Sequence, residues 1–348
     1  MKDARLDLKS RTLAELRGLM REWGEPEFRA GQIFDWIHRK KARGFGEMTN
    51  LSRALRERLE EQCRLPGVSP VKKLVSRQDG TIKYLYRLED GECVETVLMR
   101  YHYGNSLCVS SQAGCRMGCA FCASTRAGFV RGLLPAEILD QLYQTERDTG
   151  ERVSHLVMMG IGEPLDNFEN TVRFLELVTA EEGANLSMRN LSLSTCGLAD
   201  AVDRLAQLRL GLTLSVSLHA CDNATRSRLM PVNRRYPIER LLQSCQNYSK
   251  ITKRRISFEY ALIHGENDSV QEAARLAALL KGQLCHVNLI PVNEVRETGF
   301  AQSGRERVLR FQKELLRHGI NATVRRTLGS DINAACGQLR RENQTEGR

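Results

Sequence analysis

Three cysteines stand close together at Cys115, Cys119 and Cys122, with three residues between the first two and two residues between the last two. Thiolates at this spacing can bind a single metal centre. A structural zinc site normally has four ligands in two nearby pairs, and no fourth Cys or His lies close to these three. Three thiolates without a fourth favour an iron–sulfur cluster with one iron open to a small molecule. A zinc site and three unrelated buried thiols remain alternatives at this point.

The region that follows Leu107 alternates short apolar stretches with amphipathic ones, which predicts strands followed by helices. We expect strands near residues 106–110, 154–159, 189–194, 212–218, 255–262 and 285–290. We expect helices near residues 135–148, 168–181, 198–208, 238–250, 269–281 and 305–318. Six βα units in series predict an α/β fold with a parallel sheet, either a partial (β/α)6 barrel or a doubly wound fold. No G-x-G-x-x-G motif follows the first strand, which disfavours a dinucleotide-binding fold.

Polar or glycine-rich clusters follow the ends of five of these predicted strands. In chain order they are the cysteine motif, Gly162 and Glu163 in G-I-G-E-P, Ser194 in S-T-C-G, the run Ser217, Leu218 and His219, and Asn293 in P-V-N. The carboxyl ends of barrel strands are where barrel enzymes build their active sites. The G-E-P segment alone would more often be a turn and His219 alone a buried core residue, but five such clusters on one rim, one of them a metal motif, favour an active site.

The remaining parts of the chain have simpler patterns. Residues 1–65 read as helical, with Asn50 as the expected cap of a third helix from Leu51 to Cys63. Prolines then indicate a linker, followed by a β-hairpin whose strands run over residues 82–88 and 93–99. Glu95 lies on the returning strand, where a lone Glu is usually solvent-facing. Near the end of the chain, Cys336 stands between Ala and Gly, which is consistent with an accessible sulfur or with a small buried thiol.

The composition restricts the class of protein. The chain has 348 residues, with 52 basic and 42 acidic side chains and a net charge of +10, which indicates a polyanionic partner, nucleic acid above membrane. We find no apolar run long enough for a membrane span and no apolar segment that could act as a signal peptide. We therefore expect a cytoplasmic protein without a membrane partner, in which the 11 cysteines are thiols or metal ligands.

The cysteine motif, with Phe121 before its last Cys, resembles that of the radical S-adenosylmethionine (SAM) enzymes. Over residues 95–339 the chain is similar to the RlmN/Cfr family, which methylates ring carbons of adenine in RNA. The matching motifs are V-E-T-V, L-C-V-S-S-Q-A-G-C, C-A-F-C-A-S-T, G-I-G-E-P, L-S-T-C-G, S-L-H, R-L-M-P-V-N, H-V-N-L-I-P-V-N and D-I-N-A-A-C-G-Q-L. The helical N-terminal region is also present in RlmN-type members. Cys196 is a departure, because many members have Ser there.

The resemblance implies a role for each matching residue. Cys115, Cys119 and Cys122 would bind a [4Fe–4S] cluster. Gly162, Glu163, Ser194, Ser217, Leu218, His219 and Asn293 would contact SAM, of which two molecules are used per turnover. Cys336 would receive a methyl group, and a radical derived from the second SAM would activate that group for addition to the ring carbon. Glu95 would accept the ring proton, and Cys108 would release the product by forming a disulfide with Cys336.

The resemblance also implies partners and a division of the chain. We expect 23S ribosomal RNA and transfer RNA as substrates, a flavodoxin-type reductant as electron donor, and a monomer. Residues 1–65 would form a helical accessory RNA-binding domain, 66–104 a linker with the hairpin, 105–326 the radical SAM barrel, and 327–348 the catalytic loop and tail. The target would be C2 of adenine. Alternatives are a Cfr-type enzyme that methylates C8 and confers antibiotic resistance, a radical SAM enzyme acting on a small molecule, and a non-catalytic, metal-stabilised RNA-binding module.

Overall fold

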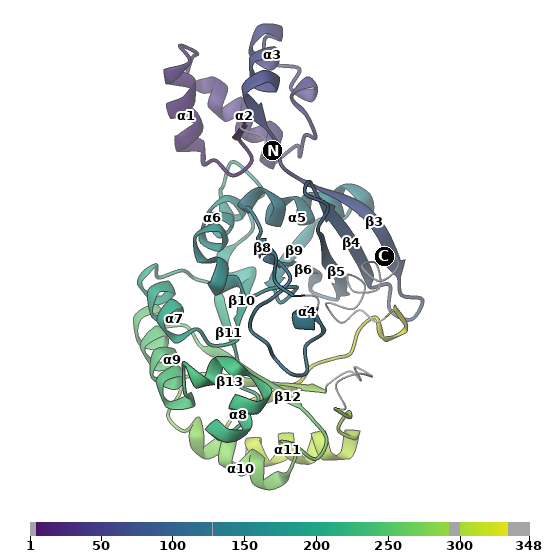
Figure 1. The fold of residues 1–348 in the computed structure, drawn as a ribbon, viewed down its shortest axis with the longest axis vertical. Coiled ribbons are helices and arrows are strands. Elements are labelled where there is room, and N and C mark those ends of the chain that lie inside the picture. The colour runs from purple at the N-terminus through teal and green to yellow at the C-terminus, as the bar shows by residue number, and fades with distance from the viewer. Residues whose placement is uncertain (1–4, 127, 292–299, 333–348) are drawn as a thin grey trace.

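The computed structural model describes residues 5–126, 128–291 and 300–332 (Figure 1). Asn293 and Cys336 lie outside the described residues. Within the described part, ten strands form one sheet in the order β14-β13-β12-β11-β10-β9-β6-β5-β4-β3. None of the described helices is long and apolar enough to cross a membrane.

The parallel part of the sheet follows the order of the chain. Its strands are β6 Gly104–Cys108, β9 Val153–Met158, β10 Leu191–Thr195, β11 Thr213–Ser217, β12 Ile256–Leu262, β13 Cys285–Pro291 and β14 Ala322–Val324. Each pairs in parallel with the next. A parallel neighbour requires a crossover connection that returns the chain to the starting edge. Because the strand order never reverses, the partial barrel is confirmed over the doubly wound alternative.

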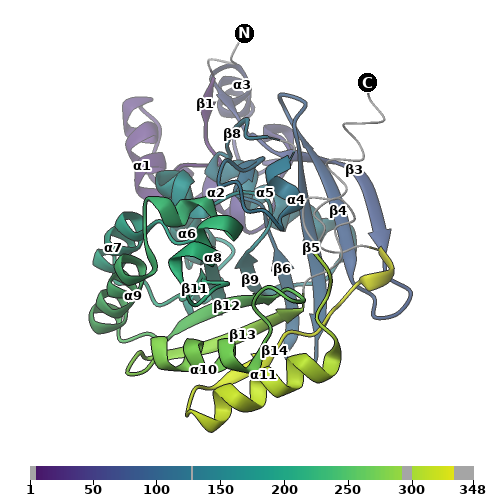
Figure 2. The same ribbon diagram turned by 60° about the horizontal axis from the view of Figure 1, so that its bottom comes forward.

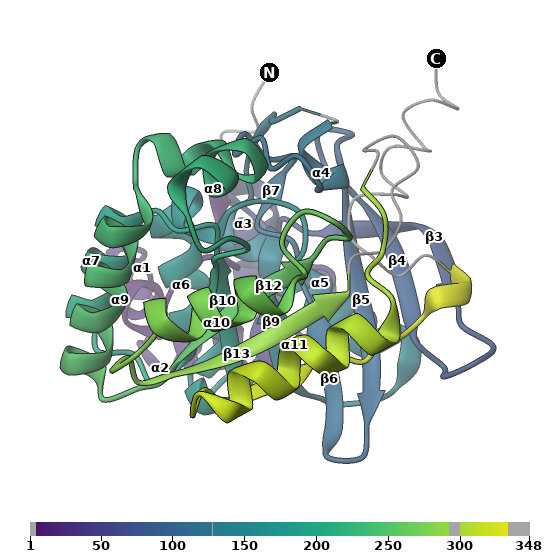
Figure 3. The same ribbon diagram turned by 90° about the horizontal axis from the view of Figure 1, so that it is seen from below.

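Helices make these crossovers on the outside of the sheet, as the view from below shows (Figure 3). They are α5 Pro135–Thr149, α6 Phe168–Thr179, α7 Ala199–Gln207, α9 Ile238–Thr252, α10 Val270–Leu279 and α11 Arg305–Arg317. All six lie where the amphipathic pattern predicts them. Apolar side chains from strands and helices, such as Leu156, Phe174 and Leu214, are fully buried between the two layers. This packing fixes the strand ends that carry the candidate site residues.

Three antiparallel strands extend the sheet beyond β6 (Figure 2). The predicted hairpin is confirmed as β4 (Ile82–Leu88) and β5 (Cys93–Tyr101). The edge strand β3 (Val68–Val75) falls where the sequence indicates a linker. Its side chains are mostly exposed, so it lacks the apolar alternation that would reveal a strand. Pro70 is tolerated there, beside an irregularity in the pairing with β4, because an edge strand need not donate every hydrogen bond.

The N-terminal region is helical as predicted, with α1 (Leu13–Glu22), α2 (Phe28–His38) and α3 (Arg53–Gln62). The expected start of the third helix at Asn50 is wrong. Ser52 caps α3 instead, since its Oγ accepts a hydrogen bond from Leu55 N at 3.2 Å. The Asn50 side chain accepts a hydrogen bond from Trp36 Nε1 at 2.6 Å. Asn50 therefore ties the loop to α2 and not to the following helix.

Helix α5 joins the N-terminal region to the barrel, and Figure 1 shows α2 and α3 above it. Lys9 Nζ lies 3.0 Å from Asp140 Oδ1, and both side chains are almost completely buried. Asp140 Oδ2 also accepts a hydrogen bond from Val68 N at 2.8 Å. His38 Nδ1 and Tyr143 Oη are 2.9 Å apart one turn further along α5. These buried polar contacts hold the helical region in one orientation against the barrel.

We expect Lys9→Met to lower the free energy of unfolding by about 3 kcal/mol, because it removes the closer and more deeply buried of the two cations that pair with the Asp140 carboxylate and leaves only Arg147, at 3.4 Å. Lys40→Met is the matched control. Lys40 pairs with Asp35 at 3.0 Å but is 45% exposed, so its loss should cost no more than about 1 kcal/mol. Urea unfolding of both variants measures the difference. Equal effects of the two substitutions would contradict the assigned importance of the buried pair.

Candidate active site

One cavity of about 380 Å³ opens at the carboxyl ends of the parallel strands. Most of the residues singled out from the sequence line it. They are Cys108, Cys115, Cys119, Cys122, Gly162, Glu163, Ser194, Ser217 and His219. Four of the five predicted polar clusters therefore share one cavity, and the fifth, at Asn293, lies outside the described residues. Leu218 and Glu95 are buried outside the cavity wall.

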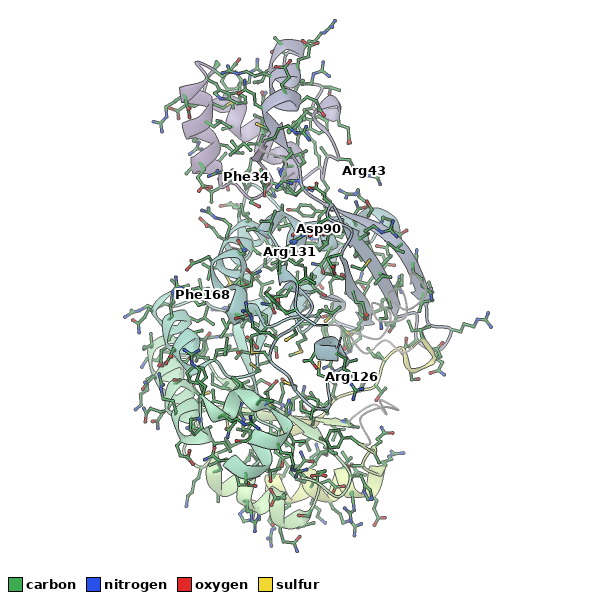
Figure 4. All side chains as sticks on the ribbon, viewed as in Figure 1. Phe34, Arg43, Asp90, Arg126, Arg131 and Phe168 are labelled. Carbon is green, nitrogen blue, oxygen red and sulfur yellow. The ribbon has the colours of Figure 1, made fainter. Side chains whose placement is uncertain are left out.

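The cysteines lie on a loop whose two ends are tied together. Strand β7 (Gln112–Ala113) pairs antiparallel with β8 (Arg131–Gly132), so the two ends of the loop of residues 114–130 lie side by side. Arg131 fixes these ends, because its guanidinium binds Glu137 at the start of α5 at 2.7 Å and also Asp90 in the β4–β5 turn. Figure 4 shows Arg131 and Asp90 beside each other. The stem of the cysteine loop is thus anchored to both the barrel and the hairpin.

The thiols of this loop share an unusual electrostatic environment. Burial, with smaller contributions from the nearby Cys122 and Glu163, raises the pKa of Cys115 to about 12. Burial, with Cys122 and Cys115 nearby, also raises the pKa of Cys119. Without a bound cation these two thiols stay protonated at neutral pH, whereas a metal would displace their protons. The donor set therefore suits a soft metal centre.

The three sulfurs face one cavity but are not gathered around one point. In the part of the chain that the structure describes, no three His, Cys, Asp or Glu side chains are arranged as a metal-binding group. The shared cavity wall supports ligation by Cys115, Cys119 and Cys122, and ligation itself stays a prediction.

The glycines after β9 let their loop pack directly on the chain that follows β6. A Cβ at Gly160 would lie 2.5 Å from the carbonyl oxygen of Val109. Gly162 has φ +108°, and a Cβ there would lie 2.6 Å from Cβ of Gln112. A larger residue would be excluded at both positions. This close approach places the next residue, Glu163, in the cavity wall.

Glu163 is a buried carboxylate whose two oxygens each accept a backbone hydrogen bond. Oε1 accepts from Leu165 N at 3.0 Å, and Oε2 accepts from Cys196 N at 2.7 Å. Burial raises the pKa of Glu163, and these hydrogen bonds oppose the shift. Glu163 therefore holds the end of β10 in place and presents an acceptor to a cationic or amino group in the cavity.

His219 is held as a neutral imidazole with a defined tautomer. Its Nδ1 accepts a hydrogen bond from Ala261 N at 2.9 Å, which leaves the ring proton on Nε2. Burial lowers the pKa of His219 to about 3. The backbone has φ +57°, which is uncommon outside glycine, and the ring meets Phe121 edge-on with centroids 4.9 Å apart. His219 can thus offer an N–H donor while it packs against the cysteine loop.

Glu95 is completely buried, so the solvent-facing position suggested by its strand pattern is wrong. Its Oε2 lies 3.0 Å from Nζ of Lys83, which is also completely buried. Strand pairing places Leu85 opposite Glu95 and Val97 opposite Lys83, so the two charges are diagonal neighbours on β5 and β4. Glu95 shares one face of β5 with Val97, which lines the cavity beside Cys108.

The sequence analysis missed a second buried acid in the cavity wall. Glu259 lies on β12, and its carboxylate accepts a hydrogen bond from Asn288 Nδ2 at 2.7 Å. Burial raises its pKa. A charged residue between Phe258 and Tyr260 in an otherwise apolar strand was the available signal.

Comparison with known proteins gives a family match for two parts of the chain. The Radical SAM superfamily profile matches residues 109–277, and the profile of the Ribosomal RNA large subunit methyltransferase N-terminal domain matches residues 6–65. Two curated relatives carry the name "Probable dual-specificity RNA methyltransferase RlmN". The one from Lachnospira eligens is 51% identical over 96% of this chain and 95% of its own length. The one from Desulforamulus reducens is 51% identical over 98% of each chain.

The chain belongs to the RlmN family. A solved structure agrees in fold: the radical SAM methyltransferase from Sphaerobacter thermophilus is 44% identical, with a TM-score of 0.91 over 96% of this chain and 98% of that one. Membership of the RlmN family implies a [4Fe–4S] cluster and SAM. The cavity wall of cysteines, Glu163 and His219 has the donor chemistry that these two groups need.

Proposed function

We propose that this protein is a radical SAM RNA methyltransferase that methylates C2 of adenine in 23S ribosomal RNA near the peptidyl transferase centre and in transfer RNA next to the anticodon. The observation that carries the proposal is the near-full-length similarity to relatives named as dual-specificity RNA methyltransferases. The gathering of nine residues singled out from the sequence around one cavity supports it.

In this proposal Cys115, Cys119 and Cys122 hold the cluster, and other residues of the same cavity hold SAM. Together the two groups supply a methyl group and a 5′-deoxyadenosyl radical that abstracts hydrogen. Glu163 accepts from the amino group of SAM, and neutral His219 donates from Nε2. Ser194 and Ser217 offer hydroxyl groups from the ends of β10 and β11. For Asn293 we propose a contact with SAM, as its motif implies.

Two further cysteines explain how an inert carbon can be methylated. C2 of adenine is electron-poor, so it does not attack a methyl sulfonium directly. Cys336 instead carries the methyl group on its sulfur and, once a hydrogen atom has been removed, forms a bond from that carbon to C2. Glu95 then takes the ring proton. The adduct radical must also lose one electron, for which the cluster would be the acceptor. Attack by the Cys108 thiolate on the sulfur of Cys336 then breaks the sulfur–carbon bond, the freed carbon takes up a proton to complete the methyl group, and a disulfide is left for an external reductant.

Described residues near Cys108 support this pairing. Val97, Met99 and Cys108 form a small buried cluster against which Leu328 packs. Cys336 follows Leu328 by eight positions, and eight residues span up to ~29 Å at ~3.6 Å each. The chain therefore returns to the neighbourhood of Cys108 shortly before Cys336.

Several features suit an RNA substrate. The chain carries a net charge of +10, which favours a phosphate backbone. Arg325 and Arg326 line the cavity and can meet the sugar–phosphate chain of an inserted nucleotide. A base must leave its stack to enter, at a cost of a few kcal/mol, so a loop is favoured over a paired helix.

The test is mass spectrometry of RNA nucleosides from cells with and without the protein. We expect 2-methyladenosine in both 23S ribosomal RNA and transfer RNA only when the protein is present. Appearance of 8-methyladenosine would instead assign the protein to the Cfr-type reaction. Identical nucleosides in both strains would refute the proposed activity.

A further inference from the structure

Arg226, on helix α8 (Asn223–Leu229), is a completely buried cation that the proposed chemistry does not use. All five N–H groups of its guanidinium have acceptors. These are Leu218 O at 3.1 Å, Asn233 Oδ1 at 2.9 Å, Tyr236 O at 3.4 Å, Cys196 O at 2.8 Å and Ser217 O at 3.1 Å. Two acceptors, on Cys196 and Ser217, belong to residues in the cavity wall. Arg226 therefore ties together the ends of β10 and β11 from behind the cavity.

The acceptors of Arg226 are uncharged oxygens. Among the residues that the structure describes, no carboxylate pairs with its guanidinium. A buried charge is strongly destabilising unless an opposite charge compensates it. Carbonyl dipoles satisfy the hydrogen bonds of Arg226 but do not neutralise its charge. The fold thus maintains an uncompensated positive charge at this position.

The cysteine loop contacts the end of the helix that carries Arg226. Ala120 N donates to the carbonyl oxygen of Leu229, the last residue of α8, at 2.9 Å. Cys119 packs against a small apolar cluster that includes Leu229. Burial lowers the pKa of Arg226, and Cys196 and Cys119 act against that shift. The backbone hydrogen bond and the shared apolar cluster therefore place Cys119 against the end of the helix that carries Arg226.

We propose that Arg226 is the fixed counter-charge of the iron–sulfur site and raises the reduction potential of the cluster bound there. The inference rests on the proposed ligand role of Cys115, Cys119 and Cys122. Reduction adds one negative charge to the cluster, and a nearby cation stabilises the reduced form more than the oxidised form. Burial keeps water from screening this interaction. Arg226 is a positioning residue, because it acts through the cluster and touches no substrate.

Two substitutions remove the charge in different ways. Arg226→Gln deletes the cation and keeps one amide donor. Asn233→Asp keeps Arg226 and places a carboxylate at the oxygen that now accepts from it at 2.9 Å, which neutralises the cation in place. Each protein is reconstituted anaerobically and titrated with dithionite, with the reduced cluster followed by electron paramagnetic resonance. We expect both variants to have a more negative midpoint potential than the unsubstituted protein.

Arg228→Gln is the matched control, because Arg228 lies on the same helix but is 55% exposed and paired with Glu266. Its substitution should leave the potential unchanged, since solvent screens an exposed charge. The cluster of Arg226→Lys should have a midpoint potential close to that of the unsubstituted protein, because this variant keeps the positive charge although it loses hydrogen bonds. Circular dichroism and iron content show which variants fold and bind the cluster. If Arg226→Gln does not fold, Asn233→Asp decides.

The outcomes separate this inference from the proposed function. If the unsubstituted protein binds no iron, the ligand assignment fails and the inference fails with it. If the cluster forms in Arg226→Gln or Asn233→Asp with an unchanged potential, only the role of Arg226 as a counter-charge is overturned. An equal shift in Arg226→Lys and Arg226→Gln would also overturn it, because geometry and not charge would then set the potential.

Discussion

Substitution of Cys108 by Ala is expected to stop the enzyme after a single event and to leave RNA covalently attached to the protein. Release of the base requires a second thiol to attack the sulfur of Cys336, and Cys108 is the candidate because it lines the cavity in the cluster against which Leu328 packs. Carbon–carbon bond formation does not need that thiol, so the adduct should accumulate to at most one RNA per protein. Denaturing electrophoresis with labelled RNA measures the attached fraction, and nuclease digestion leaves a nucleotide on the Cys336 peptide for mass spectrometry.

Cys93→Ala is the control for this experiment. Cys93 is a buried thiol on the neighbouring strand β5, but it lies outside the cavity wall. The same side-chain change there should give normal multiple turnover and no adduct. If Cys108→Ala released free methylated RNA at the normal rate, Cys108 could not be the thiol that resolves the adduct.

Substitution of Cys122 by Ala is expected to abolish both the bound iron and the brown colour of the anaerobically reconstituted protein. A cluster held by three thiolates should not persist with two. Loss of the cluster removes the source of the radical, so RNA methylation should fall to the background of the assay. Iron analysis and visible absorption measure the first effect, and methyl incorporation into RNA measures the second.

Cys221→Ala provides the comparison, because Cys221 is partly buried outside the cavity and its Sγ contacts the carbonyl oxygen of Glu272 at 3.4 Å. We expect this variant to keep its iron and its colour. A zinc site would give a colourless protein with and without Cys122. Full iron content in Cys122→Ala would show that this thiol is not a ligand.

Local patterns in the sequence predict the barrel well. Each predicted strand and helix of residues 105–326 has a clear apolar period and turn residues at its ends, and the polar residues after the strands meet because parallel strands share one carboxyl edge. The segment from Gly160 to Glu163 is an example. Its glycines predict that the backbone packs closely against another segment, although the sequence does not show which segment that is. In contrast, β3 has few buried side chains and therefore no recognisable period.

The buried charges that the sequence could not predict depend on contacts between segments that are far apart in the chain. Glu95 reads as a surface residue until strand register brings buried Lys83 beside it. Arg226 looks like one of several arginines on a polar stretch, and only the fold shows its guanidinium enclosed by five oxygens. Lys9 and Asp140 are 131 positions apart, so no local pattern could pair them. Nine of the cavity residues were predictable, whereas Glu259 in the cavity wall and the buried charges Lys83, Arg226 and Lys9 were not.

The most direct test of the carrier role of Cys336 uses SAM with a fully deuterated methyl group. If the methyl group first resides on the sulfur of Cys336 and loses one deuterium there, the methyladenine formed after the first turnover should contain two deuterium atoms, and 5′-deoxyadenosine should contain the third. Mass spectrometry of both products gives the answer. A methyladenine that retains all three deuterium atoms would contradict the account, because the methyl group would then have passed to the base intact.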